Sequence, residues 1–337
     1  MKDVELHQLH QAAAVDQTTA ADLVVSESTR ARIRDGIAAN TRRAYGRHWA
    51  TFESWCASTG RRPMPATAQT LAEYVDQLCT AGHAPATIEQ AIAAVRTMHR
   101  TAGHKAQPDT EAARHVLRGY KRERAEDGLG GQREAPPVTI DALRAMIGAC
   151  DLSTRLGVRD RLVLVLGLAL MGRRSELVAL TLDDVTEAAD GIEVRIRTSK
   201  TDKESRGEVV AVPRGSHPLT DPVRAWRDWL DVLAAEGIIS GRLLRSVNRH
   251  GRVGASLGTN AINDTVRRLA VAAEVPAADR FTAHSLRAGG ATVAYAAGVP
   301  VSVIAKHGRW SPNSPVVLRY IRAVDRWKDN AMRNVGL

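Results

Sequence analysis

The stretch GLGGQREAPP, residues 128–137, divides this sequence into two parts. It holds three glycines and two prolines among ten residues, and its charges are mixed. Glycine loses much conformational freedom in regular structure and proline cannot donate a backbone hydrogen bond, so neither a helix nor a strand continues easily through such a cluster. The stretch therefore predicts a linker between two domains, which suits a chain of 337 residues.

Helical patterns fill the region before the linker. Apolar side chains recur there three or four residues apart, so that they line one face of each helix. The helical stretches are 41–60, 67–82, 84–103 and 110–127. Four helices of this length with short connections predict a compact bundle, which we assign to residues 29–127. Residues 1–28 are polar and rich in alanine, and they predict a flexible N-terminal tail.

The region after the linker, residues 138–337, combines helical and strand patterns. TIDALRAMIGAC (139–150) predicts its first helix, and DRLVLVLGLALMG (160–172) predicts a buried central helix. GIEVRIRTSK (191–200) alternates apolar and charged side chains, and GEVVAVP (207–213) returns after it. These two segments predict a β-hairpin, alone or within a three-stranded sheet, with TSKTDKESR at its tip. The expected fold class is mainly α with a small antiparallel β-sheet.

The chain is strongly basic. Lysine and arginine number 47 against 37 aspartates and glutamates, which gives a net charge of +10 at pH 7, and arginine supplies 40 of the 47. Because basic surfaces attract polyanions, a nucleic acid is the expected partner. The apolar content of 44% is enough for folded cores and argues against a disordered chain.

The cysteines and the N-terminus indicate where the protein works. Cys56, Cys79 and Cys150 are isolated from one another, so they predict buried or free thiols in a reducing compartment, not a disulfide framework or a zinc site. The N-terminus lacks the basic and apolar regions of a secretory signal. The longest apolar run, LVLVLGLALMG (162–172), is too short to span a bilayer. We therefore expect a cytoplasmic protein, associated with the nucleoid and not with a membrane.

Four short segments of the second region concentrate charged or aromatic side chains: MGRRSELVAL (171–180), SKTDK (199–203), FTAHSLRAGG (281–290) and HGRWSPNSPVVLRYIR (307–322). Each has an ordinary explanation on its own, namely solvated loop arginines, exposed lysines, a structural histidine and a core tyrosine. His284 and Arg287, however, lie three residues apart and share one face of a helix. Two such side chains close together imply an anion between them.

Read together, the segments resemble the ordered active-site signature of the tyrosine site-specific recombinases, also called phage integrases, and look closest to the Cre-like branch. The signature residues are Arg173, Lys200, His284, Arg287, Trp310 and Tyr320, with Glu176 in support. The resemblance covers about residues 35–330, and NTRRAYGRHWATFESWC and PATIEQAIAAVRTMHRTAG look like the family's core-binding helices. It implies a helical core-binding (SAM-like) domain and an α+β catalytic domain that close on duplex DNA as a C-shaped clamp.

The resemblance implies a role in phosphoryl transfer for each signature residue. Arg173 and Arg287 match the two catalytic arginines, whose guanidiniums bind the nonbridging oxygens of the scissile phosphate and stabilise the charge that develops there. Tyr320 matches the nucleophile, and His284 matches the general acid/base that takes its proton. Lys200 matches the hairpin lysine that protonates the departing 5′ oxygen.

Two of these assignments have alternatives. Lys203 is the alternative to Lys200. Trp310 matches a family position that is His or Trp, where an indole N–H donates to the phosphate, and His307 is the alternative to it. Glu176 matches a supporting acidic position that orients its neighbours.

The spacing of the last two signature residues departs from the family pattern. Trp310 and Tyr320 lie ten residues apart, where the family has nine. SPNSP (311–315) is expected to absorb the extra residue and to start the next helix through its Ser-Pro pair. Tyr295 is expected in the core and not at the reacting phosphate.

The resemblance also implies partners. The substrate is double-stranded DNA with inverted-repeat half-sites, and a homotetramer synapses two such sites. Arg42, Arg43 and Arg47 are the expected phosphate or base contacts of the first domain. AVDRWKDNAMRNVGL (323–337) is expected either to dock on a neighbouring protomer as an exchange helix or to pack on its own domain. An accessory directionality factor is a further candidate partner.

No cofactor, metal ion or ATP is expected, because the resemblance implies that the energy of the broken bond is kept in a covalent phosphotyrosine link. The sequence also offers no convincing carboxylate cluster for two-metal chemistry. Asp183 and Asp184 are expected to lie at a solvated helix end before the first strand.

Two other functions remain open. A type IB topoisomerase or telomere resolvase would share the phosphotyrosine step without exchanging strands between sites. A non-catalytic architectural or regulatory protein would keep the fold and bind DNA, although the complete signature argues against it.

Overall fold

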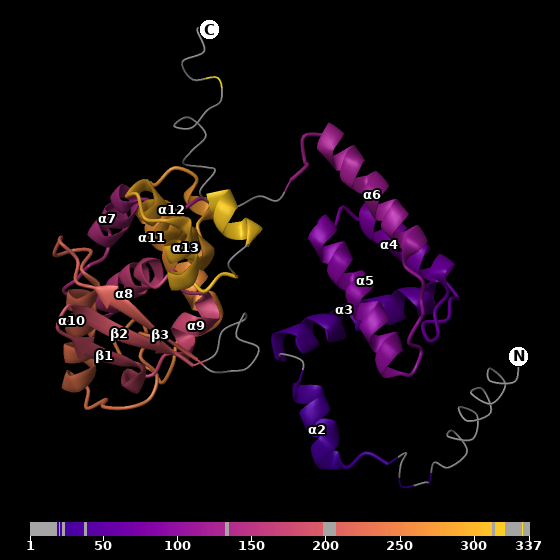
Figure 1. Ribbon diagram of the computed structural model, residues 1–337, viewed down its shortest axis with the longest axis horizontal. Coiled ribbons are helices and arrows are strands. Elements are labelled where there is room, and N and C mark those ends of the chain that lie inside the picture. Colours follow the sequence, from indigo (N-terminus) through magenta and orange to yellow (C-terminus); the bar gives the residue numbers. More distant parts are fainter. Residues whose placement is uncertain are drawn as a thin grey trace, which may run out of the picture. The chain divides into compact units, whose positions relative to one another are not determined.

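The computed structural model describes residues 19, 21, 24–36, 39–131, 135–197, 207–311, 314–320 and 332. The chain divides into two compact units, Met1–Gln132 and Arg133–Leu337 (Figure 1). Each unit encloses its own cluster of buried apolar side chains. Most of the tail expected at residues 1–28 lies outside the described residues.

The first unit is a bundle of helices. Its described helices are α2 (Glu27–Asp35), α3 (Ala39–Ser58), α4 (Ala68–Thr80), α5 (Pro85–Thr101) and α6 (Glu111–Glu126). Helix α3 packs on α5, and α4 packs on α6. The sequence starts these helices with suitable residues, since the Thr67 hydroxyl accepts the Thr70 N–H at 3.1 Å and Pro85 opens α5.

Aromatic side chains fill the centre of this bundle. The rings of Phe52 and Tyr74 meet edge to face with centroids 5.0 Å apart, and Trp55 lies against both. His99 is fully buried, its ring meets Trp49 edge to face, and its Nε2 accepts the Ala66 N–H at 2.8 Å. Burial lowers the pKa of His99, which favours the neutral ring that can accept this bond.

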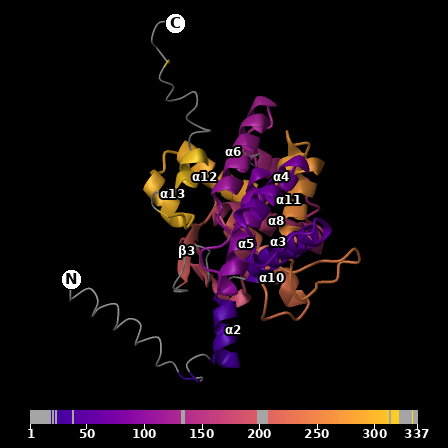
Figure 2. The same ribbon diagram turned by 90° about the vertical axis from the view of Figure 1, so that its right-hand side faces the viewer.

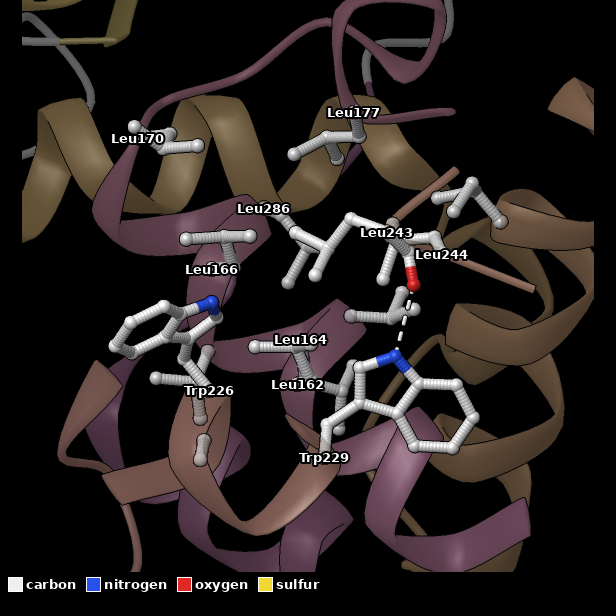
Figure 3. Packing of buried hydrophobic residues seen from close by; sticks show 14 of the residues in the cluster. Leu162, Leu164, Leu166, Leu170, Leu177, Trp226, Trp229, Leu243, Leu244 and Leu286 are labelled. Atoms are coloured by element: carbon white, nitrogen blue, oxygen red, sulfur yellow. Dashed lines mark hydrogen bonds between the residues drawn. The ribbon is translucent and has the colours of Figure 1, made fainter. Parts of the chain in front are cut away.

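The second unit is built around one buried helix. Its labelled α-helices are α7 (Ile140–Gly148), α8 (Arg155–Ala169), α9 (Arg174–Ala179), α10 (Pro222–Ala235), α11 (Thr259–Ala272), α12 (Ala283–Ala296) and α13 (Val301–His307), with short 3-10 turns η2 (Leu182–Asp184) and η3 (Ala278–Arg280). Residues 315–320 are helical as well. Helix α8 packs against α10 and α12, so its leucines are covered on several sides. Figure 3 shows Leu164 and Leu166 among these buried side chains, with Trp229 donating its indole N–H to the Leu243 carbonyl at 2.8 Å.

Within the described residues, the sheet of the second unit has three antiparallel strands in the order β1-β2-β3. They are β1 (Val185–Ala188), β2 (Gly191–Ile196) and β3 (Glu208–Pro213). Val194 of β2 pairs with Val210 of β3, and both side chains are buried. A mainly helical protein with a small antiparallel sheet was the prediction, and it is confirmed.

Asp184 departs from the expected solvated helix end. It closes η2 just before β1, but it is 3% exposed. Its carboxylate accepts the Thr181 N–H at 2.9 Å and the Arg197 Nε–H at 2.7 Å. The prediction was wrong for Asp184 because its partner Arg197 follows two strands later, directly after β2. Asp183 is exposed, as expected.

Helix α12 is seated closely against the rest of the unit. A Cβ on Gly289 would lie 2.3 Å from the Val138 carbonyl oxygen, and one on Gly290 would lie 2.5 Å from the Leu168 carbonyl oxygen. The Val138 N–H also donates to the Ser285 carbonyl at 3.0 Å. Gly289 therefore lets the α12 backbone approach the segment before α7, and Gly290 lets it approach the end of α8. Helices α12 and α13 lie next to each other in both views (Figures 1 and 2).

The three cysteines are buried and unbonded to one another. Burial raises the pKa of Cys56, raises that of Cys79 to about 11 and raises that of Cys150 to about 12. Across the part of the chain that the structure describes, helices are too short or too polar to cross a membrane.

Candidate active site

Arg173 stands at the start of α9, in the turn that follows α8. Its backbone is extended there, and its N–H donates to Glu176 Oε2 at 2.9 Å, which satisfies one donor at the helix start. Its guanidinium Nη1 lies 2.6 Å from Glu176 Oε1. Glu176 therefore holds Arg173 by both its backbone and its side chain.

Glu176 is buried between two arginines. Its Oε2 accepts from Arg309 Nη2 at 2.9 Å, and both side chains in this pair are 2% exposed. Burial by itself raises the pKa of the Glu176 carboxyl, but Arg309 and the two donors of Arg173 outweigh it and leave the pKa below its usual value. Glu176 is thus an ionised acceptor that orients cations, consistent with the supporting role expected for it.

Arg287 projects from the buried face of α12. It is 3% exposed, its Nη2 donates to the Gly308 carbonyl at 2.6 Å, and its Nη1 donates to the Met171 carbonyl. Burial and the charge of Arg173 lower the pKa of Arg287 to about 9. A phosphate beside this guanidinium would favour its charged form, so the site is electrostatically suited to an anion.

His284 and Tyr320 meet at hydrogen-bond distance. The capped start of α12 presents His284 at the surface, since the Thr282 hydroxyl accepts the His284 N–H at 3.2 Å. Tyr320 belongs to a helical segment that begins at residue 315, and this tyrosine is 8% exposed. Its hydroxyl lies 2.5 Å from His284 Nε2, so in the tautomer with an unprotonated Nε2 the phenol O–H donates to the ring.

Trp310 contacts both Arg287 and Tyr320. The Arg287 guanidinium carbon is 3.9 Å from the centre of the Trp310 ring, a cation–π contact, and Trp310 and Tyr320 meet edge to face with centroids 6.1 Å apart. His307, the alternative to Trp310, has its Nε2 within 2.7 Å of the Ala169 carbonyl. Its hydrogen bond faces the protein backbone, which favours Trp310 as the aromatic partner of the cluster.

A hollow of about 300 Å³ opens beside these side chains. It is lined by Gly172, Arg173, Arg174, Asn263, Thr282, Ala283, His284 and Arg287. The two guanidiniums predicted from the sequence therefore border one pocket, together with the histidine that reaches Tyr320. Such a pocket offers planar donors to the oxygens of one phosphate group.

The structure brings together Arg173, Glu176, His284, Arg287, Trp310 and Tyr320. Lys200 and its alternative Lys203 lie outside the described residues, as does the exchange segment expected at 323–337 apart from residue 332. Tyr295 is half-buried and packs against a small apolar cluster, where a core role was expected.

The first unit carries a second concentration of cations. Arg42, Arg43 and Arg47 lie on α3, where Arg43 and Arg47 are exposed. A larger group surrounds a groove of about 650 Å³ between α5 and α6, which we call the α5–α6 groove. Its exposed cationic residues are Arg96, Arg100, Lys105, Arg114, Arg118 and Lys121.

Sequence reasoning missed Arg309 and the α5–α6 groove. Arg309 stands inside HGRW, which was singled out for its histidine and tryptophan, and nothing in the local pattern points to its burial. The groove arises because two consecutive helices, α5 and α6, pack with cationic side chains on both of its sides. A count of arginines and lysines along α5 and α6 was the one available signal for it.

Comparisons with known proteins agree on one family. The model of the phage integrase family matches residues 138–326, more than half of the chain. The chain is 29% identical over 315 residues to an integrase/recombinase XerD homolog of Selenomonas ruminantium, spanning 92% of this chain and 89% of that protein. It is 25% identical over 296 residues to the Cre recombinase of Escherichia phage P1, spanning 83% and 82%.

A solved structure shares the fold. The integrase of transposon Tn1549, in complex with transposon right-end DNA, superposes with a TM-score of 0.59. The aligned part covers 90% of this chain and 96% of that one at 14% sequence identity. At this identity the likeness concerns the fold of the chain.

Proposed function

This chain belongs to the phage integrase family, the tyrosine recombinases, and from that premise we propose that it cuts and rejoins DNA at specific sites through a 3′-phosphotyrosyl intermediate. The observation that carries the proposal is the Tyr320 hydroxyl 2.5 Å from His284 Nε2, beside a pocket lined by Arg173 and Arg287. This arrangement supplies a nucleophile, a base and donors for a phosphate in one place.

Cleavage begins with attack by the Tyr320 oxygen on the scissile phosphorus. The bond between phosphorus and the tyrosyl oxygen forms, and the bond from phosphorus to the 5′ oxygen breaks. The phenolic proton passes to His284, and Lys200, with Lys203 as the alternative, protonates the departing 5′ oxygen. Arg173, Arg287 and the Trp310 N–H stabilise the negative charge on the nonbridging oxygens.

Rejoining is the reverse of cleavage. A free 5′-hydroxyl of a partner strand attacks the phosphotyrosine and passes its proton to the lysine that was deprotonated during cleavage. The bond from phosphorus to the Tyr320 oxygen breaks, and His284 returns a proton to the phenol. The phosphotyrosine link keeps the energy of the broken phosphodiester, so the cycle needs neither ATP nor a metal ion.

Both units contribute to DNA binding in this proposal. The two units close on duplex DNA as a C-shaped clamp, with residues 29–127 as the core-binding domain, 128–137 as the linker and 138–337 as the catalytic domain. Arg42, Arg43, Arg47 and the cations of the α5–α6 groove neutralise phosphates. The reaction takes place on DNA in the cytoplasm.

The assembly follows from the number of strands that are cut. Each site is cut once on each of its two strands, so it needs two protomers, and two sites need four. A homotetramer holds two sites, each with inverted-repeat half-sites, and the segment 323–337 docks on a neighbouring protomer. An accessory factor that sets direction is a further expected partner.

A nicked duplex substrate tests the proposed chemistry. With a nick beside the cleavage position, cleavage frees a short strand that carries the 5′-hydroxyl. This strand dissociates, so rejoining fails and covalent protein–DNA complex accumulates, which a denaturing gel detects. The duplex is an inverted repeat from the DNA that flanks the gene for this protein, chosen because the protein binds it. We expect adduct formation both with and without EDTA, whereas a protein that binds this duplex and never forms an adduct would be an architectural or regulatory factor.

Two further assays distinguish recombination from related reactions. A recombinase exchanges strands between two sites on separate duplexes. A type IB topoisomerase relaxes a supercoiled plasmid that lacks any site, and a telomere resolvase forms hairpin ends. Recombinant product without site-independent relaxation or hairpins is the expected result.

A further inference from the structure

Arg309 occupies an unusual place in the backbone. It lies in the turn after α13 with a φ of +57°, a left-handed backbone conformation that residues other than glycine rarely adopt. Such a conformation costs on the order of 1 kcal/mol and persists where the surroundings hold it. Here the side chain folds back into the protein and is 2% exposed.

Arg309 and Arg287 join the same two turns of the chain. Arg287 donates to the carbonyls of Met171 and Gly308. Arg309 donates to the carbonyl of Leu170 at 3.2 Å and to that of His307 at 3.0 Å. Two neighbouring guanidiniums thus tie the end of α8 to the end of α13. At each end they bind the carbonyls of two consecutive residues.

Arg309 also reaches Arg173 by two routes. Its Nη2 lies 2.9 Å from Glu176 Oε2, and the other oxygen of Glu176 lies 2.6 Å from Arg173 Nη1. In addition, the backbone carbonyl of Arg309 accepts from Arg173 Nη2 at 3.3 Å. A shift of Arg309 would therefore move the acceptors that aim the Arg173 guanidinium.

Arg309 does not line the pocket that Arg173 and Arg287 border. It is thus placed behind the pocket, where it acts on the reacting phosphate through other side chains. A lysine would keep the charge of Arg309, but it lacks the planar fork that reaches Glu176, Leu170 and His307 at once.

We propose that Arg309 is a positioning residue for DNA cleavage, which holds Glu176 and its own carbonyl where they aim the Arg173 guanidinium at the scissile phosphate. This inference rests on the proposed function, because it concerns the same phosphate. It predicts that loss of Arg309 slows cleavage of bound DNA and leaves DNA affinity nearly unchanged.

The experiment measures single-turnover adduct formation on the nicked duplex at saturating protein, together with the dissociation constant for the same duplex. The variants are Arg309→Met, Arg309→Lys, Arg173→Ala and the double variant Arg173→Ala/Arg309→Met. Arg159→Met is the matched control, since Arg159 is equally buried and pairs with Asp160 at 2.6 Å on α8. Thermal melts fix a temperature at which every variant is folded.

Groups that orient a ligand without touching the substrate typically change activity by about 10- to 100-fold in metal sites, and we expect a loss of that order from Arg309→Met. Arg309→Lys should recover part of it. On the Arg173→Ala background the Arg309→Met change should have little further effect, because the guanidinium that it aims is already gone. Arg159→Met should keep the wild-type cleavage rate at the chosen temperature.

A pH profile adds a measurement that a purely structural role would not move. Arg173, Arg287 and Arg309 are the charged groups that face Glu176, and Arg309 helps to lower the pKa of its carboxyl. Without Arg309 that pKa rises, so the cleavage rate of Arg309→Met should begin to fall at a higher pH on acidification than that of the wild type.

Several results would overturn the inference and leave the proposed function standing. They are wild-type cleavage by Arg309→Met, an equal fold-loss in both backgrounds, and a similar loss in Arg159→Met. If Arg309→Met does not fold, the same criteria apply to Arg309→Lys in both backgrounds. Absence of adduct from the wild-type protein would instead refute the proposed function itself.

Discussion

The α5–α6 groove of the first unit and the pocket beside α12 of the second unit are both lined by cations, but the cations are held in different ways. The groove cations are exposed, and where an ion pair is present, as between Lys121 and Glu89 at 2.6 Å, both partners are about half exposed. Arg287 in the pocket is buried and fixed by two backbone carbonyls, and Arg173 is fixed by Glu176.

This difference separates binding from chemistry. Exposed cations are mobile and screened by salt, so they attract any phosphate backbone and bind it with little geometric demand. Buried guanidiniums in fixed positions need no reorganisation when charge develops on a reacting phosphate. Substitutions in the groove should therefore change affinity, and those in the pocket should change rate.

The strongest test of this separation is Tyr320→Phe. Removal of the phenolic oxygen removes the nucleophile, so covalent adduct should disappear completely while DNA affinity stays near that of the wild type. A denaturing gel and a binding titration on one nicked duplex measure the two quantities. Adduct that persists in this variant would place the nucleophile elsewhere.

Arg287→Ala should have the next largest effect. Loss of one donor to the transition state costs on the order of 10²-fold or more in cleavage rate at saturating protein. Arg118→Ala in the groove is the matched control, and it should cleave bound DNA at the wild-type rate. Equal rate losses in the two variants would contradict the division between the two regions.

Salt should affect the two regions unequally. Binding should weaken steeply as salt rises, and Arg96→Ala and Arg118→Ala should each reduce the slope of log affinity against log salt by about 1, as expected for one lost phosphate contact. The cleavage rate of the saturated complex should change little over the same range. Fluorescence anisotropy measures the slope, and Arg224→Ala, an exposed arginine of α10, serves as the control.

The smallest expected effect concerns stability and pH. The pKa of Glu176 is lowered in the folded protein, so its contribution to stability is present above the unfolded value and is lost as pH falls through the folded value. Glu176→Gln should destabilise the protein by about 1–3 kcal/mol at pH 7. The difference in denaturant midpoint between wild type and variant should shrink on acidification. A difference that stays constant down to acid pH would refute the assignment of a negative charge to Glu176.

The elements of this fold are largely visible in local patterns. The period of two in GIEVRI matches β2, and the threonines and prolines before apolar stretches match helix starts such as those of α4 and α5. The order of Arg173, His284, Arg287 and Tyr320 also indicated one site, because a family signature is a pattern in sequence.

Long-range partners were not visible in the same way. The burial of Arg309 depends on Glu176, which lies far away in the chain, and on a left-handed turn that arginine rarely enters. The burial of Asp184 depends on Arg197, which follows two strands later, and the α5–α6 groove depends on how two helices pack. Such features follow from tertiary contacts, and no periodicity in the chain encodes them.

The buried cysteines make this protein a convenient subject for fluorescent labelling. Their high pKa values leave few thiolates at neutral pH, so maleimide dyes should react far faster with a cysteine placed on the surface. Ala112 on α6 and Asp231 on α10 are exposed positions, one in each unit. A dye pair at these two positions would report, through energy transfer, how the separation of the units changes when DNA is added, with every native cysteine left in place.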